Sequence, residues 1–378
     1  MWPEEGAPAV PILRALLTAL LVLTLLPAGT ASLPSEPHLT PASSYLHRLL
    51  IEGGAPAAAF LAGPSTSAPY GTYGSAGTGI RSGDRFRAGS ITKTFVATVV
   101  LQLAGEGRLR LSDSVEVYLP GLIHGHGNDG ARITLRSLLT HTSGLYDYTE
   151  ALPSSDPAVT GTAGPSAQPL TPGTAIRAAL SHSPAGAPGA FAYSSTNYVL
   201  LGLVVQRVTG HPYAAEIQSR LLTPLQLSGT SLPGALSTLP VPHSRGYHRS
   251  ADGTLRDVTA IDPRVAGAAG ELVSTLADLN RFYAALLGGR LLPPAQLIAL
   301  LDTRAAQGLY AMGVYPQTLS CGTTVWGHNG HITGSYVRTA ATADGRHVFT
   351  FRVNADAEPD PGSEAALLEA EFCPSPTA

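Results

Sequence analysis

The chain has 378 residues, of which 44% are hydrophobic and 13% are charged, and this composition excludes general disorder and allows a large core. The 23 basic and 26 acidic residues give a formal net charge of −3. Because the arginines are scattered singly, the sequence offers no basic stripe for nucleic acid.

The N-terminal segment has the features of a secretory signal peptide over residues 1–31. Residues 15–26 form an apolar block after Arg14, and small residues from position 27 offer a cleavage point after Ala31. The block is shorter than the ~20 residues that a membrane helix needs, so a permanent membrane anchor is the weaker alternative. We therefore expect a secreted, extracytoplasmic protein.

Early strands are predicted at 57–62 and 69–73, and an apolar helix that begins near Ser90 follows them. Lys93, the only lysine in the chain, lies three residues after Ser90, so the two side chains share one helix face with Cβ atoms roughly 5–6 Å apart. The backbone N–H of a serine at a helix start favours developing negative charge. A desolvated lysine can lose its proton and act as a base, which arginine cannot. The alternative is a capping serine and a lysine that reaches solvent.

Helices are predicted in the middle of the chain at 135–139, 174–181, 199–208, 214–221 and 277–287. Residues 153–172 are rich in Pro, Gly, Ser and Ala and are predicted to form a mobile loop near the cleft. His124 and His126 lie in a glycine-rich loop and are interpreted as residues of a solvated loop rather than metal ligands, and the sequence has no Cys-x-x-Cys or His-Glu-x-x-His motif. We therefore expect no metal and no cofactor. His141 is expected to support the backbone rather than to react.

Tyr193 is predicted at a junction between the loop at 184–189 and the helix at 199–208. A tyrosine near cationic groups can act as an acid or a base, because those charges favour the phenolate. The alternative is that Ser194, Ser195 or Thr196 caps the helix and Tyr193 only packs against it.

The C-terminal part is predicted to contain strands at 323–326, 335–343 and 346–354, a hairpin turn at 344–345 and a helix at 363–372. The segment from Trp326 to His331 lies between two of these strands. Gly330 there would let another backbone or a ligand approach closely. His328 could hold a substrate anion or assist proton transfer, and a surface histidine in a turn is the alternative.

Two cysteines, Cys321 and Cys373, are the only ones in the chain. In an oxidising compartment they are expected to form a single disulfide. Two buried free thiols are the alternative.

Together and in this order, these motifs resemble the serine D-alanyl-D-alanine carboxypeptidase and class C β-lactamase superfamily. Residues 132–144 and 266–275 look like two further segments of that family, and the similarity spans about residues 40–375. The resemblance implies an α/β fold of the α+β type, with an antiparallel sheet flanked by helices. It implies one catalytic domain at 40–375, with a sheet lobe at about 40–110 and 305–375 and an inserted helical lobe at about 111–304.

The resemblance also implies roles for the candidate residues. Ser90 would be the nucleophile, Lys93 its partner in proton transfer and Tyr193 the acid or base facing the leaving group. The backbone N–H groups of Ser90 and His331 would form the oxyanion hole. The residues implied to bind substrate are Ser195, His328, Asn329 and Gly330.

Two positions depart from the family pattern. Ser195 stands where the family usually has an asparagine that contacts both the lysine and a substrate carbonyl, and Asn197 is two residues too late to replace it. Asn329 stands where the family strand motif usually has Thr or Ser. His328 instead of lysine resembles the carboxypeptidase branch more than the β-lactamases.

The expected function is that of a secreted, monomeric serine hydrolase that forms an acyl-enzyme. The leading expectation is a D-alanyl-D-alanine carboxypeptidase that acts on peptidoglycan stem peptides, or on another small acyl substrate, with β-lactams as inhibitors. The same site suits an esterase, a D-amino-acid peptidase or a β-lactamase. From another class comes a weakly active protein that binds penicillin or peptidoglycan.

Overall fold

The computed structural model describes residues 45–46, 55–63, 70–74, 79–151, 170–250, 252–356 and 361–373. All of them belong to one compact unit, residues 39–378. The predicted signal peptide and residues 153–169 of the predicted loop lie outside the described residues. The division of the compact unit into a sheet lobe and a helical lobe stays a prediction.

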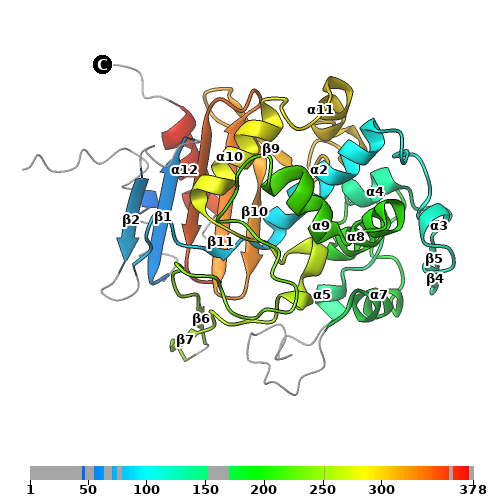
Figure 1. Cartoon of the computed structure of the whole chain (residues 1–378), viewed down its shortest axis with the longest axis horizontal. Coiled ribbons are helices and arrows are strands. Elements are labelled where there is room, and N and C mark those ends of the chain that lie inside the picture. The colour runs from blue at the N-terminus through cyan, green and yellow to red at the C-terminus, as the bar shows by residue number, and fades with distance from the viewer. Residues whose placement is uncertain are drawn as a thin grey trace, which may run out of the picture. The chain divides into compact units, whose positions relative to one another are not determined.

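A six-stranded sheet brings the two ends of the described chain together (Figure 1). Its strands are antiparallel throughout. In spatial order they are β2 (Tyr70–Gly74), β1 (Ala57–Ala62), β12 (Val348–Val353), β11 (Ser335–Thr342), β10 (Thr324–Ile332) and β9 (Tyr315–Thr318). The early and late strands predicted from the sequence are therefore confirmed as parts of one sheet, while β9 was not predicted.

The sequence interpretation of Trp326–His331 as a link between strands is wrong. These six residues lie inside β10, and the register continues through them, with His328 opposite Thr339 and His331 opposite Tyr336. The two glycines and the asparagine of the segment weaken its strand signal, but pairing along β11 outweighs this local preference. The hairpin turn at Asp344-Gly345 is present, and Gly345 has the positive φ of +68° that favours glycine there.

Both faces of the sheet are covered, because alternate side chains of its central strands are apolar on each side. Ala58 and Phe60 of β1 pack in a cluster with residues of helix α12 (Pro361–Phe372). Ala59 and Leu61 point to the other face and belong to the main core, where α10 (Leu276–Leu287) contacts β1, β11 and β12. In Figure 1, α12 and α10 lie on opposite sides of the strands.

The remaining helices form a second region beside the sheet (Figure 1). The α-helices there are α2 (Thr92–Gly105), α3 (Val115–Tyr118), α4 (Leu135–Leu139), α5 (Tyr148–Ala151), α7 (Pro172–Leu180), α8 (Ser195–Thr209), α9 (Tyr213–Ile217) and α11 (Pro294–Leu300). Short helical turns are η1 (Gly89–Ile91), η2 (Gln218–Leu222), η3 (Pro263–Val265), η4 (Gly267–Ala269) and η5 (Arg304–Ala306). All five helices predicted for the middle of the chain are present, and α11 was not predicted.

Three short strand pairs connect these helices: β3 (Phe86–Arg87) with β8 (Val273–Ser274), β4 (His124–Gly125) with β5 (Asn128–Asp129), and β6 (Tyr247–Arg249) with β7 (Leu255–Asp257). The pair of β3 and β8 matters most for the site, because β3 leads directly into η1 and α2. It fixes the backbone that enters the helix of Ser90 and Lys93.

The predicted disulfide joins Cys321, before β10, to Cys373, just after α12, with their Cα atoms 5.8 Å apart. It therefore ties the entry to β10 to the helix that covers the sheet. Within the described parts of the chain, no helix is both long enough and apolar enough to cross a membrane.

Candidate active site

Two glycines bring strand β10 directly against the turn that carries Ser90. A Cβ atom on Gly330 would lie 1.9 Å from the carbonyl oxygen of Ala88. Gly89 has a φ of +51°, and a Cβ atom there would lie 2.9 Å from the backbone nitrogen of His331. Any larger residue at either position would push the strand away from the turn. The close backbone approach predicted at Gly330 is thus observed, and its partner is Ala88.

Ser90 lies in η1, immediately before α2, and Lys93 follows one turn later. The Nζ atom of Lys93 lies 3.0 Å from the Oγ of Ser90 and 2.8 Å from the carbonyl oxygen of Ala269 in η4. Lys93 is only 1% exposed. Burial lowers its pKa from 10.5 to about 7, and the negative charge of Asp147 acts in the opposite direction. A neutral amine is therefore available near pH 7 to take a proton from Ser90.

Tyr193 completes a cluster of three groups. Its hydroxyl is near enough to the side chain of Ser90 for that serine to lower its pKa, and its ring centroid lies 5.0 Å from the Nζ of Lys93. Although the residue as a whole is 39% exposed, burial of the hydroxyl raises its pKa above 10, against a smaller lowering by Ser90. The expectation that cationic neighbours favour a phenolate is therefore wrong. Lys93 itself loses much of its charge near pH 7, so the neutral phenol suits proton donation or relay.

His328 does not have the role expected from the sequence. It is 1% exposed, its Nε2 lies 2.8 Å from the hydroxyl of Tyr310, and its Nδ1 hydrogen-bonds the carbonyl of Asn329. Burial lowers its pKa from 6.5 to about 3, so the ring is neutral, with Nδ1 donating and Nε2 accepting. It offers no positive charge to a substrate anion, and it positions Tyr310 instead.

The other residues expected in β10 differ in their surroundings. Asn329 is half-buried, and His331 is exposed, with its Nε2 2.6 Å from the carbonyl oxygen of Asp356. The backbone of His331 lies against Gly89, next to the nucleophile turn. An oxyanion hole made by the amides of Ser90 and His331 is compatible with this arrangement and stays a prediction.

Ser195 is the first residue of α8 and is 8% exposed. Its backbone N–H donates to the Oδ2 of Asp147 at 2.8 Å. Asn197 lies too deep to replace the missing amide of the family pattern, since it is fully buried and accepts a hydrogen bond from Ser143 at 2.6 Å.

His141 supports the backbone, as its place in the sequence suggested. Its Nδ1 accepts the N–H of Ser194 at 3.1 Å, and its carbonyl accepts the N–H of Ala192 at 2.8 Å. Its ring lies 4.2 Å from the ring of Tyr193. Burial lowers the pKa of His141 well below 6.5, so a neutral imidazole holds the segment around Tyr193 from both sides.

Asp147 and Ala269 contribute to the site and were not found from the sequence. Asp147 is 7% exposed, and its Oδ1 accepts from the backbone and hydroxyl of Thr149. Its charge acts on both Lys93 and Tyr193. One signal in the sequence could have pointed to Asp147. It lies three residues after Gly144, the end of the family-like segment 132–144. Ala269 acts through a carbonyl, which no side-chain pattern reveals.

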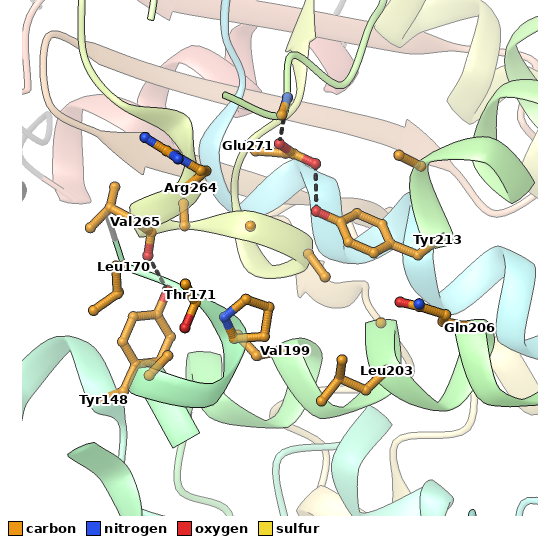
Figure 2. A pocket seen from close by; sticks show the side chains of 18 residues that line it. Tyr148, Leu170, Thr171, Val199, Leu203, Gln206, Tyr213, Arg264, Val265 and Glu271 are labelled. Atoms are coloured by element: carbon orange, nitrogen blue, oxygen red, sulfur yellow. Dashed lines mark hydrogen bonds between the residues drawn. The ribbon is translucent and has the colours of Figure 1, made fainter. Parts of the chain in front are cut away.

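A cavity of about 300 Å³ lies elsewhere in the helical region, and Figure 2 shows the side chains that line it. Apolar residues of α8, such as Val199 and Leu203, form one wall, and η4 forms another. At one end the buried carboxylate of Glu271 accepts hydrogen bonds from the hydroxyl of Tyr213 and the N–H of Gly234. Neither Ser90, Lys93 nor Tyr193 lines this cavity, so it is separate from the candidate catalytic cluster.

A comparison of the chain with family models agrees with the order of the motifs and with the way Ser90, Lys93 and Tyr193 come together. The model described as Beta-lactamase matches residues 49–372. The chain belongs to the Beta-lactamase family. The α/β fold, with its antiparallel sheet and flanking helices, is accordingly that of the β-lactamases and transpeptidases.

Among solved structures, this β-lactamase-family protein is similar to a D-stereospecific amidohydrolase from Streptomyces sp., with 39% identity, a TM-score of 0.79 and coverage of 89% of this chain and 99% of that one. A D-amino acid amidase from Ochrobactrum anthropi SV3 shares the fold, with 24% identity, a TM-score of 0.73 and coverage of 87% and 98%.

Among curated proteins, penicillin-binding protein 4 of Amycolatopsis lactamdurans is 29% identical over 257 residues, which cover 67% of this chain and 63% of that protein. A protein named as penicillin-binding, PbpX of Bacillus subtilis, is 29% identical over 230 residues, 61% of this chain and 53% of that protein. The chain thus spans between half and two thirds of the length of these curated relatives. The names of these two relatives agree with the assignment of the chain to the Beta-lactamase family.

Proposed function

We propose that this β-lactamase-family protein is a D-stereospecific serine amidohydrolase. It would transfer the acyl group of a D-amino-acid amide, ester or short peptide to Ser90 and then to water. The observation that carries the chemistry is the 3.0 Å contact between Ser90 and a fully buried Lys93 whose pKa is about 7.

In this reaction the neutral amine of Lys93 takes the proton of Ser90 as its Oγ attacks the substrate carbonyl. The phenol of Tyr193, whose pKa is affected by the side chain of Ser90, then gives a proton to the leaving nitrogen or oxygen and recovers one from the protonated Lys93. The C–N or C–O bond breaks, and the acyl group stays on Ser90. In the second half of the reaction, water gives up a proton to the same cluster and attacks the carbonyl of the acyl-enzyme. The ester bond to Ser90 breaks, Ser90 regains its proton and the acid is released.

Two observations favour an amidohydrolase over the D-alanyl-D-alanine carboxypeptidase expected from the sequence. Recognition of a free terminal carboxylate calls for a positive group, and His328, the residue expected to supply one, is buried and neutral. The similarity to the Streptomyces D-stereospecific amidohydrolase extends over 99% of that chain at 39% identity. Carboxypeptidase action on cell-wall peptides remains the second candidate, supported by the likeness to penicillin-binding proteins.

A matched pair of substrates separates the two candidates. An N-acylated D-alanyl-D-alanine and its C-terminal carboxamide differ only in the terminal charge. We expect kcat/KM for the carboxamide to equal or exceed that for the free acid, and D-phenylalanine p-nitroanilide to react at least about tenfold faster than its L-enantiomer, a difference of about 1.4 kcal/mol in activation free energy. A strong requirement for the free carboxylate would favour the carboxypeptidase. Equal rates for the two enantiomers would contradict D-stereospecificity.

We also propose that the protein is secreted. The apolar block at residues 15–26 supports this proposal, and so does the Cys321–Cys373 disulfide, because such bonds persist mainly in oxidising compartments. Processing is tested by N-terminal sequencing of protein recovered from the culture medium of the source cells. A mature N-terminus near residue 32 is expected, and an intact N-terminus found only inside the cells would contradict secretion.

A further inference from the structure

The cavity of about 300 Å³ in the helical region (Figure 2) has no part in the proposed reaction, because Ser90, Lys93 and Tyr193 do not line it. Its walls come from segments that are distant in sequence, among them α7, α8 and η4. At the ~30 Å³ of liquid volume that a water molecule occupies, the space suits about ten non-hydrogen atoms. The apolar side chains that line it include Leu170, Ala175, Val199, Leu203, Val265 and Ala268. The cavity therefore has the size and the apolar walls of a site for a small organic molecule.

Glu271 places a carboxylate at one end of this cavity (Figure 2). The residue is only 3% exposed. Its Oε1 accepts a hydrogen bond from the hydroxyl of Tyr213, and its Oε2 accepts the N–H of Gly234 at 3.1 Å. A carboxylate has about four acceptor positions, so these two hydrogen bonds leave capacity for a further donor. Both donors are neutral, and they satisfy the oxygens without cancelling the charge.

The charge of Glu271 is not balanced by a cation of the cavity wall. Arg264 is the one cationic side chain among the described residues that line the cavity, but Asp262 holds its guanidinium, with Nε to Oδ1 at 2.9 Å and Nη2 to Oδ2 at 2.6 Å. Burial raises the pKa of the Glu271 carboxyl, and only the hydrogen bonds from Tyr213 and Gly234 act in the opposite direction. A buried carboxylate without a cation is unfavourable, so this end of the cavity favours a positively charged group.

We propose that this cavity binds a small hydrophobic amine, whose ammonium group pairs with Glu271 and whose aromatic or aliphatic body packs along α8. A water molecule there could donate hydrogen bonds to the carboxylate but would bring no charge. An anionic molecule would be repelled by Glu271, and a neutral one would leave the carboxylate unpaired.

The bound amine would lie next to the groups that act on Lys93. Ala268 lines the cavity, and the following residue, Ala269, accepts a hydrogen bond from the Nζ of Lys93 at 2.8 Å. Tyr148 lines another part of the cavity and directly follows Asp147, whose charge raises the pKa of Lys93. The ligand would thus contact neighbours of both groups without reaching the nucleophile, and it would be a different molecule from the substrate of the proposed reaction.

A matched pair of ligands tests the charge requirement. 3-Phenylpropylamine and 3-phenylpropan-1-ol have the same number of non-hydrogen atoms, but only the amine is positively charged at neutral pH. In isothermal titration calorimetry with the whole protein, the amine should bind more tightly than the alcohol by roughly tenfold or more, as expected for a hydrogen bond to a charged partner. No measurable binding of the amine, or equal Kd values for the two ligands, would overturn the proposal.

Two variants test the role of Glu271. Glu271→Gln keeps the size and an oxygen that can accept the hydroxyl of Tyr213, but it removes the charge, so the amine and the alcohol should bind equally well. Glu150→Gln, the same change at an exposed glutamate outside the cavity, should keep the preference for the amine. If Glu271→Gln retained the full preference as well, the ammonium group would not pair with Glu271 and the proposal would fail.

A third variant tests the location without changing any charge. Leu203 is half-buried on the α8 wall, and Leu203→Trp should fill the cavity and weaken the binding of both ligands by roughly tenfold or more. Circular dichroism shows whether each variant is folded, and Leu203→Trp gives an answer even if Glu271→Gln does not fold. Unchanged affinity for the amine in folded Leu203→Trp would mean that the amine binds elsewhere. None of these measurements involves acyl transfer, so their outcome is independent of the proposed amidohydrolase activity.

Discussion

The amine of Lys93 is held between the hydroxyl of Ser90, at 3.0 Å, and the carbonyl oxygen of Ala269, at 2.8 Å. The carbonyl fixes one N–H direction, and the serine lies in another. Because burial brings the pKa of Lys93 to about 7, this position serves a proton acceptor better than a permanent cation. The use of lysine here and arginine at all other basic positions has a chemical reason in this geometry.

Replacing Lys93 by arginine tests that reason. Arginine keeps the charge but cannot act as a neutral base, so the acylation rate with an activated ester should fall by roughly 100-fold or more. Stopped-flow release of p-nitrophenol measures the rate. Circular dichroism and Tm show whether the larger side chain has disturbed the fold, and Lys93→Met serves as an uncharged, smaller control. Near-normal acylation in folded Lys93→Arg would mean that the lysine acts only by its charge or packing.

The pH dependence of acylation follows from the same group. Below about pH 7 Lys93 is protonated and cannot accept a proton, so kcat/KM should rise with pH and level off above the pKa of about 7. The charge of Asp147 raises this pKa. Asp147→Asn should therefore lower the pKa and move the rising limb to lower pH.

The pH–rate profile of Asp147→Asn, compared with that of the surface variant Asp252→Asn, checks this direction. Asparagine keeps a side-chain oxygen that can still accept the N–H of Ser195, so the change is mainly one of charge. An unchanged limb, or one that moves to higher pH, would show that Asp147 does not act on Lys93 as inferred.

Ser195 offers a test of substrate handling. Its side chain is shorter than asparagine and lacks the paired amide donor and carbonyl acceptor, and one well-placed hydrogen bond is worth about 0.5–1.5 kcal/mol. Ser195→Asn should therefore raise peptide turnover by roughly tenfold and change ester turnover much less. The test is to measure kcat/KM for a peptide and for an ester, each with the parent protein and with Ser195→Asn. Equal changes, or slower peptide turnover, would indicate a site built around the serine.

The disulfide between Cys321 and Cys373 closes a sequence separation of 52 residues. Removing it in the double variant Cys321→Ser/Cys373→Ser should lower the free energy of unfolding by about 2–4 kcal/mol. Urea unfolding monitored by fluorescence measures the difference, and a thiol assay of the unreduced parent protein should find no free thiols. An unchanged unfolding midpoint in the double variant would contradict a stabilising role.

The sequence predicted the secondary structure best where local signals were strong. The apolar run of β1 and the turn at Asp344-Gly345 each mark their element without help from distant residues. Strand β10 was misjudged around Trp326–His331 because its glycines weaken the local pattern, and only pairing with β11 makes it a strand. Strand β9 was not predicted because its four residues are too few to show a clear alternation of apolar and polar side chains.

The candidate site divides in the same way. Ser90 and Lys93 could be paired from a spacing of three residues on one helix. The pKa directions of Tyr193 and His328 could not be predicted, because they depend on burial by other segments of the chain, such as the one that places the ring of His141 against Tyr193. Asp147 and the carbonyl of Ala269 became visible only once the chain was folded.

Trapping of the acyl-enzyme tests the central claim most directly. The purified protein would be incubated with a fluorescent penicillin or an activated D-aminoacyl ester, digested and analysed by tandem mass spectrometry, with Ser90→Ala treated in parallel. A stoichiometric adduct on Ser90 that is absent from Ser90→Ala is the result predicted here. An adduct on another residue, or equal labelling of Ser90→Ala, would contradict the assignment of Ser90 as the nucleophile.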